Sequence, residues 1–99
     1  MPTAQFERIA KALADPRRFA LLEKIAAHRE YPCSLLCEEF PVSKGTISHH
    51  VKELIRAGLV RGVREGQHVT YYMQRDVLAA YNAALQARLS PGALPTPKS

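Results

Sequence analysis

Two cysteines four residues apart are the side chains best suited to chemistry in this sequence. Cys33 and Cys37 are its two cysteines, and His28 precedes Cys33 by five positions. On a helix, positions i and i+4 share one face, so the two sulfurs can chelate a soft ion such as As(III), or a Zn(II) completed by another ligand. A direct disulfide needs a non-helical backbone at Cys33, because such Cβ atoms lie about 5–6 Å apart in a helix and about 3.8 Å apart in a disulfide.

Three interpretations of this cysteine pair stay open. Cys37 can be a small core residue with Cys33 as an incidental thiol, since free cysteines are often buried and inert. Alternatively, the pair senses thiol or redox chemistry, or it binds a soft ion. Two thiols and His28 fall short of the four ligands that structural zinc takes. The expected cofactor is therefore As(III), Zn(II) or none.

A concentration of positive charge is the second chemical feature. The 99 residues carry 14 Lys+Arg and 9 Asp+Glu, a formal net charge of +5. Residues 43–75 hold two acidic and six basic side chains, or +4 of that charge; the basic ones are Lys44, Lys52, Arg56, Arg61, Arg64 and Arg75. A solvated face usually interleaves both signs, so this asymmetry favours a phosphate-binding surface.

The element that would carry much of this charge is a predicted helix beginning after Ser43. Its apolar residues fall within a sector of about 100°; they are Ile47, Val51, Leu54 and Ile55. Ala57-Gly58 ends it, since glycine supplies the left-handed conformation after a helix. The free N–H groups around residues 44–46 suit a phosphate or base edges.

On the polar side of this helix, Ser48 and His49 are hydrogen-bonding side chains of the kind that read bases in the major groove. His50 lies nearer the apolar sector, and we expect it to bond within the protein. Beyond the helix, residues 59–64 and 69–73 are rich in β-branched and aromatic types and flank the turn-forming residues 65–68, which predicts a β-hairpin.

Amphipathic patterns predict the remaining helices. Asp15 should cap a second helix, Ser34 a short third helix ended by Pro41, and Asp76 a last helix. The expected apolar positions are Phe6, Ile9, Ala10 and Leu13; Phe19, Leu22, Ile25 and Ala26; Leu35, Leu36 and Phe40; and Val77, Leu78, Tyr81, Ala84, Leu85 and Leu89. Residues 28–32 read as a loop, and the proline-rich residues 90–99 as a disordered tail.

The order of elements predicts a mainly α winged helix-turn-helix with a β-hairpin wing (α-α-α-α-β-β-α), spanning residues 1–89 as one domain. Its partner would be double-stranded DNA. A single recognition helix reads few base pairs, so we expect a homodimer formed through the wide apolar faces of the first and last helices.

Several classes are excluded by length and pattern. No stretch approaches the ~20 apolar residues of a membrane span, and the N-terminus lacks a signal-peptide arrangement, so a cytoplasmic protein without a membrane partner is expected. Nothing brings a base, an orienting acid and an oxyanion site together, so we expect no enzyme.

Four segments of the sequence closely resemble the ArsR/SmtB family of bacterial winged helix-turn-helix repressors. They are ALADPRRF at 12–19, VSKGTISHHVKEL at 42–54, AGLVR at 57–61 and REGQHVTYY at 64–72. The resemblance covers residues 6 to about 89 and implies a homodimeric repressor that binds an inverted-repeat operator. Such a repressor releases DNA when an inducer, often a metal or metalloid ion, binds.

Mapping the family's base contacts gives Lys44, Gly45, Ser48 and His49, where Lys44 departs from a common glutamine and Gly45 from a common serine. The full predicted DNA-binding set is Ser43, Lys44, Gly45, Thr46, Ser48, His49, Lys52, Arg56, Arg64, Gln67 and His68. Arg64, Gln67 and His68 would lie at the wing tip, near the backbone or minor groove.

The family's known sensor motifs are absent as written. Its Cys-x-Cys pair maps onto Pro32 and Ser34, and its last-helix zinc site onto Asp76 and Leu78 with no histidine following. Cys33 and Cys37 therefore remain the candidate metal or redox site. The alternative functions are a winged-helix protein-interaction module or a regulator with no small-molecule sensor.

Overall fold

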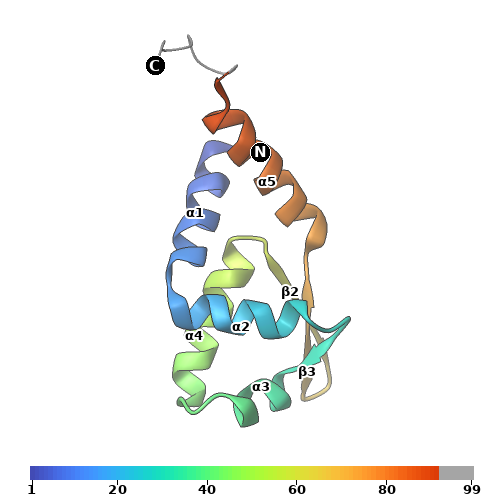
Figure 1. Cartoon of the computed structure of the whole chain (residues 1–99). Helices are drawn as coiled ribbons and strands as arrows, with labels where there is room; N and C mark the ends of the chain where they lie inside the picture. Colours follow the sequence, from blue (N-terminus) through green and yellow to red (C-terminus); the bar gives the residue numbers. More distant parts are fainter. Residues whose placement is uncertain (92–99) are drawn as a thin grey trace.

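The computed structural model describes residues 1–91, which form five helices and one three-stranded antiparallel sheet (Figure 1). In chain order these are α1 (Thr3–Ala14), α2 (Pro16–Ala26), β1 (Tyr31–Pro32), α3 (Cys33–Glu39), α4 (Lys44–Arg56), β2 (Val60–Glu65), β3 (His68–Met73) and α5 (Arg75–Leu89). The predicted winged helix-turn-helix is confirmed, with β1 as an additional strand.

The junction between α1 and α2 follows from two residues. The Asp15 carboxylate accepts hydrogen bonds from the backbone N–H groups of Arg17 and Arg18 at 2.9 and 3.1 Å. Pro16 occupies the first turn of α2, where its missing N–H costs nothing. The predicted cap is therefore confirmed.

The buried face of α2 differs from the one expected. Leu21, Leu22 and Ile25 are buried, whereas Phe19 is 43% exposed. Because α2 packs against α1, α4 and β3, its buried arc centres on Leu21 and leaves Phe19 at the margin. On α1, Ile9 is fully buried and Ala10 is exposed.

Residues 28–32 are predicted from the sequence to be a loop, but the last two of them form a short strand. Tyr31 and Pro32 form β1, which pairs antiparallel with Tyr71 and Thr70 of β3. Tyr31 is fully buried. A strand of two residues is too short to show an alternating apolar pattern, so the local sequence does not predict it.

The short helix α3 begins two residues earlier than predicted. Pro32, not Ser34, is its N-cap, and Cys33 is its first residue. Leu36 enters the core, but Leu35, also expected there, is 40% exposed. An ion pair of 2.8 Å between Lys24 and Glu39 links α2 to the end of this helix.

Helix α4 is capped at both ends as expected. The Ser43 hydroxyl accepts the Thr46 N–H at 3.2 Å. At the other end Gly58 has φ of 83°, and Leu59 N–H donates to the Leu54 carbonyl at 3.0 Å, the pattern of a glycine-ended helix. Ile47, Val51 and Leu54 are buried, whereas Ile55 is 41% exposed.

The hairpin turn is tighter than the predicted four residues. Glu65 pairs with His68, so both belong to strands and only Gly66 and Gln67 form the turn. Gly66 has φ of 61°, and no non-glycine residue among residues 1–91 has a positive φ, which matches a type II′ turn. The sheet order is β1-β3-β2.

Helix α5 runs back along α1, and the two converge at the end of the molecule opposite α3 (Figure 1). The rings of Phe6 and Tyr81 are 5.0 Å apart, and the Arg88 guanidinium lies 4.1 Å from the Phe6 ring centroid. Asp76 lies in the first turn, but Gln74 is the N-cap, and no side chain caps the helix.

Leu89, expected on the apolar face of α5, is 75% exposed. Of the predicted tail, residues 92–99 lie outside the described residues. Within residues 1–91, no helix combines the length and apolar character needed to cross a membrane.

Candidate nucleic-acid interface

A cavity of about 650 Å³ lies between α3, the first half of α4 and the wing. Lys44 and Ser48 line it from α4, and Gln67 and His68 line it from the hairpin. These four residues belong to the predicted DNA-binding set and come from two separate elements. The fold therefore joins the recognition helix and the wing tip into one groove, which we call the α4/wing groove.

A second cavity of about 310 Å³ continues this groove along α4. Ser48 lines both cavities, and here it is joined by Lys52 of α4 and Arg64 of β2. Lys44, Lys52 and Arg64 are exposed. Three cations thus border a concave surface on which a phosphate backbone can lie.

The first turn of α4 presents backbone donors beside the groove. The Ser43 hydroxyl is occupied, since it accepts the Thr46 N–H and shares a 3.0 Å hydrogen bond with the Thr46 hydroxyl. Gly45 is exposed and has no side chain to cover the N–H groups of this turn. A helix N-terminus of this kind favours an anion.

His49 and His50 separate as expected. His49 is exposed on the outer face of α4, whereas His50 is buried, with 8% of its surface exposed. Burial lowers the pKa of His50, against the opposing effect of the Asp15 carboxylate; Arg18, His49 and Arg17 lower it further. The expected internal bond is not seen at Nδ1, which has no hydrogen-bond partner in the described part of the chain.

Three of the six basic residues between 43 and 75 have structural partners outside the α4/wing groove. Arg56, one of the predicted DNA-binding residues, donates to Glu53 at 3.0 Å and lines a shallow hollow with residues of α1. Arg61 stacks 4.7 Å from the Tyr72 ring centroid. Arg75 donates to the Ala26 carbonyl at 2.6 Å. Three of the six cations are therefore engaged in contacts within the protein, outside the α4/wing groove.

Residues that sequence reasoning missed also line the groove. Val69, Thr70 and Tyr71 of β3 face it beside Ile47 of α4. These residues lie in the half of β3 next to the turn. The alternating sequence pattern predicts a strand there but does not predict which face of the strand packs toward α4.

The two cysteines line the same cavity as Lys44 and Ser48. Both lie in α3 and are free and half-buried. Burial, and then the neighbouring Cys33 thiol, raises the pKa of the Cys37 thiol; Lys44 acts in the opposite direction. Burial and Cys33 also raise the pKa of the Tyr71 hydroxyl. Cys33 therefore lies near the Cys37 thiol of its own helix and near the Tyr71 hydroxyl of the wing.

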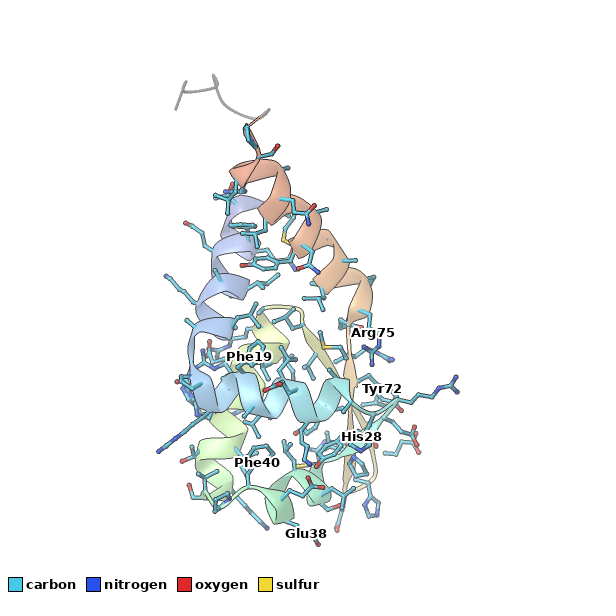
Figure 2. The ribbon with its side chains drawn as sticks, in the orientation of Figure 1. Phe19, His28, Glu38, Phe40, Tyr72 and Arg75 are labelled. Atoms are coloured by element: carbon cyan, nitrogen blue, oxygen red, sulfur yellow. The ribbon has the colours of Figure 1, made fainter. Side chains whose placement is uncertain are left out.

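His28 is not part of this cluster. Its Nδ1 lies 2.9 Å from the Lys24 carbonyl, and its ring packs 4.9 Å from that of Tyr31. Figure 2 shows His28 on the same side of the molecule as Tyr72. Among residues 1–91, no three His, Cys, Asp or Glu side chains come together as a metal site.

A helix-turn-helix whose second helix borders a basic groove completed by a hairpin wing defines a class of DNA-binding regulators. Comparison with known families agrees: residues 13–63 match the helix-turn-helix domain family. The chain is also 32% identical over 85 residues to the arsenical resistance operon repressor of Staphylococcus xylosus, covering 86% of this chain and 81% of that protein.

Solved structures show the same architecture. An ArsR-like transcriptional regulator from Rhodococcus sp. RHA1 superposes with a TM-score of 0.78 at 26% identity, covering 90% of this chain and 82% of that one. The homodimeric winged helix-turn-helix DNA-binding domain of Mb0332 from Mycobacterium bovis gives 0.69 at 26% identity, with 97% and 88% covered. The chain belongs to the ArsR family of winged helix-turn-helix transcriptional repressors, a family of DNA-binding regulators and not of enzymes.

Proposed function

We propose that this chain represses transcription as a homodimer on an inverted-repeat operator, with α4 in the major groove and the wing against the flanking backbone. The observation that carries the proposal is the convergence of Lys44 and Ser48 from α4 with Gln67 and His68 from the hairpin on one groove. Cations at its edge would bind phosphates, and Ser48 and His49 would contact bases.

The dimer is proposed to form through α1 and α5. Phe6, Leu78 and Leu85 on these helices are only partly buried, and Leu89 is 75% exposed. The similar Mb0332 domain is homodimeric. Two-fold symmetry would place two copies of α4 about 34–36 Å apart, one turn of DNA.

The test is binding of the full chain to duplexes from its own promoter region at several salt concentrations. A dimer making 6–10 phosphate contacts should lose about 10³–10⁵ in affinity between 50 and 200 mM salt. An affinity that ignores salt, or a promoter duplex bound no better than a scrambled duplex, would overturn the proposal. Light scattering with and without DNA reports the stoichiometry.

A signal at Cys33 and Cys37 is proposed to release the DNA. What supports this is position: both thiols line the cavity that Lys44 and Ser48 line, so an adduct there would occupy space next to the DNA-facing residues. Two soft sulfur donors suit a thiophilic ion of low coordination number such as As(III), whereas Zn(II) prefers four ligands.

A direct disulfide meets a geometric obstacle. Both cysteines are helical, and Cβ atoms at i and i+4 in a helix are about 5–6 Å apart, beyond the reach of a disulfide. Oxidation by hydrogen peroxide, in which the two thiols lose two hydrogen atoms to form the S–S bond and the peroxide is reduced to two water molecules, would therefore require the first turn of α3 to unwind.

Operator binding by reduced, peroxide-treated, As(III)-treated and Zn(II)-treated protein separates these signals. The same series is run on Cys33→Ser and Cys37→Ser. Release of DNA by one treatment in the wild type but in neither variant would identify the signal. Equal affinity in every condition would leave a regulator without a sensor at these thiols.

A further inference from the structure

A pocket of about 390 Å³ lies apart from the α4/wing groove, between α2 and the turn that joins α3 to α4. Its walls are mainly apolar and come from Ala20, Leu21, Phe40, Pro41 and Val42. Figure 2 shows Phe40 between α2 and the α3 end of the molecule. The volume is within the range of about 300–1,000 Å³ that small-molecule sites occupy.

His50 of α4 supplies a polar group to this apolar pocket. Its side chain is more than nine-tenths buried, and Nδ1 has no hydrogen-bond partner within residues 1–91. Buried polar atoms in native proteins are almost always paired, so this residue of the pocket wall carries an unsatisfied hydrogen-bonding group. The lowered pKa of His50 keeps the ring neutral at pH 7.

Arg17 gives the pocket its charge. The guanidinium-bearing side chain is exposed and lines the opening, and none of the lining residues is acidic. The nearby Asp15 carboxylate already accepts two backbone N–H groups as the cap of α2. Within residues 1–91 the Arg17 guanidinium has no hydrogen-bond or ion-pair partner, and a free cation beside apolar walls is complementary to an anion with an apolar body.

We propose that this pocket binds a small carboxylate with an aromatic or branched aliphatic body, its carboxylate toward Arg17 and its body against Leu21 and Phe40. The pocket touches α2, the α3–α4 turn and His50, which belongs to the recognition helix. An occupant would thus bear on the orientation of α4 relative to α2. The role of the bound carboxylate as an effector of DNA binding rests on the proposed function, whereas the binding of the carboxylate to the pocket does not.

The experiment uses the full chain without DNA, with benzoate as the probe. Ring signals of His50 are followed by NMR during titration. We expect a saturable shift with millimolar affinity, and a raised His50 pKa because a bound carboxylate favours the protonated ring. Benzyl alcohol, with the same ring and no charge, should bind about tenfold more weakly.

Matched variants locate the site. Arg17→Gln should weaken benzoate binding about tenfold, whereas Arg8→Gln, which removes an exposed cation on α1, should leave it unchanged. His50→Phe keeps the apolar bulk and loses the ring nitrogens. Because its own signals are gone, its binding is read from Leu21 methyl shifts, and circular dichroism confirms that it folds.

No saturable shift up to about 20 mM benzoate would overturn the proposal, as would equal binding of benzyl alcohol or full binding by Arg17→Gln. Operator affinity is then measured with and without benzoate. Binding of benzoate with no change in operator affinity would overturn the effector role. Failure to bind any duplex would overturn the proposed function, while the NMR result would stand independently.

Discussion

Cys37 of α3 and Ser48 of α4 line the same cavity. The proposed cysteine site would therefore not have to signal through the fold. It lies beside the residues predicted to contact DNA, so occupancy of the groove by DNA and modification of the thiols should exclude each other.

Bound operator should protect both cysteines from alkylation. With excess operator duplex, we expect the rate of modification by N-ethylmaleimide, followed by mass spectrometry, to fall in proportion to the fraction bound. Because the pKa of Cys37 is raised, its alkylation rate should still be climbing above pH 9. Equal rates with and without operator would place the thiols outside the DNA-covered surface.

Removal of the predicted base readers should change specificity more than affinity for random DNA. Ser48→Ala and His49→Ala are expected to reduce the ratio of operator to scrambled-duplex affinity by about tenfold, a typical cost for one lost base contact. Arg64→Ala, which removes a cation at the groove, should weaken both duplexes alike. Fluorescence anisotropy measures both. An unchanged ratio for Ser48→Ala would contradict its role.

The salt dependence of DNA affinity should distinguish cations that line the α4/wing groove from cations that have partners elsewhere in the protein. Lys52→Gln is expected to lower the slope of log affinity against log salt by about 1 per protomer, the value for one lost phosphate contact. Arg61→Gln removes the same charge from the stack on Tyr72 and should leave the slope unchanged. If both variants shifted the slope equally, the division into two sets would be wrong.

His50 should make the fold sensitive to mild acid. Its pKa is lowered in the folded chain, so the unfolded chain, with an imidazole pKa of about 6.5, binds the proton more readily. The free energy of unfolding should therefore fall as pH drops below about 6.5, until the folded-state pKa is passed. Urea titrations between pH 7.5 and 5 test this.

Two variants serve as the comparison for that titration. His50→Gln removes the titrating ring and should flatten the dependence. His49→Gln changes an exposed histidine on the same helix and should keep the wild-type slope. If only His49→Gln flattened the slope, the pH dependence would belong to His49 and the prediction for His50 would be wrong.

A side chain at Gly58 should destabilise the fold. It has φ of +83°, and a Cβ there would meet Gln5 Nε2 at 3.0 Å. Gly58→Ala should lower the free energy of unfolding by about 1–3 kcal/mol, the cost of a strained backbone. In contrast, Gly45→Ala meets nothing closer than 3.9 Å and should be neutral or slightly stabilising. Denaturant midpoints measure both; a neutral Gly58→Ala would refute the strain argument.

Features set by close neighbours in the chain could be predicted from sequence. Asp15 and Ser43 cap helices through N–H groups two or three residues away, and Gly58 ends α4 through bonds to its last turn. Strand β1 could not be found in this way, because Tyr31 pairs with Tyr71, a partner that only the complete fold supplies.

The candidate interface shows the same division. Charge counting predicted the region, but it treated all six cations alike. Only packing reveals that Arg75 donates to the Ala26 carbonyl and that Arg61 stacks on Tyr72. Likewise, the spacing of Cys33 and Cys37 predicted a shared helical face, but their position beside Ser48 depends on how α3 docks against α4.

The bond from Arg75 to the Ala26 carbonyl fastens the first residue of α5 to the last turn of α2. It also satisfies a carbonyl that the end of a helix leaves without a partner. In a dimer built on α1 and α5, this hydrogen bond would link the subunit contact to the segment that leads into α3. The tolerance of the protein for operators whose half-sites are one base pair too close or too far apart would then depend on a residue that touches no DNA.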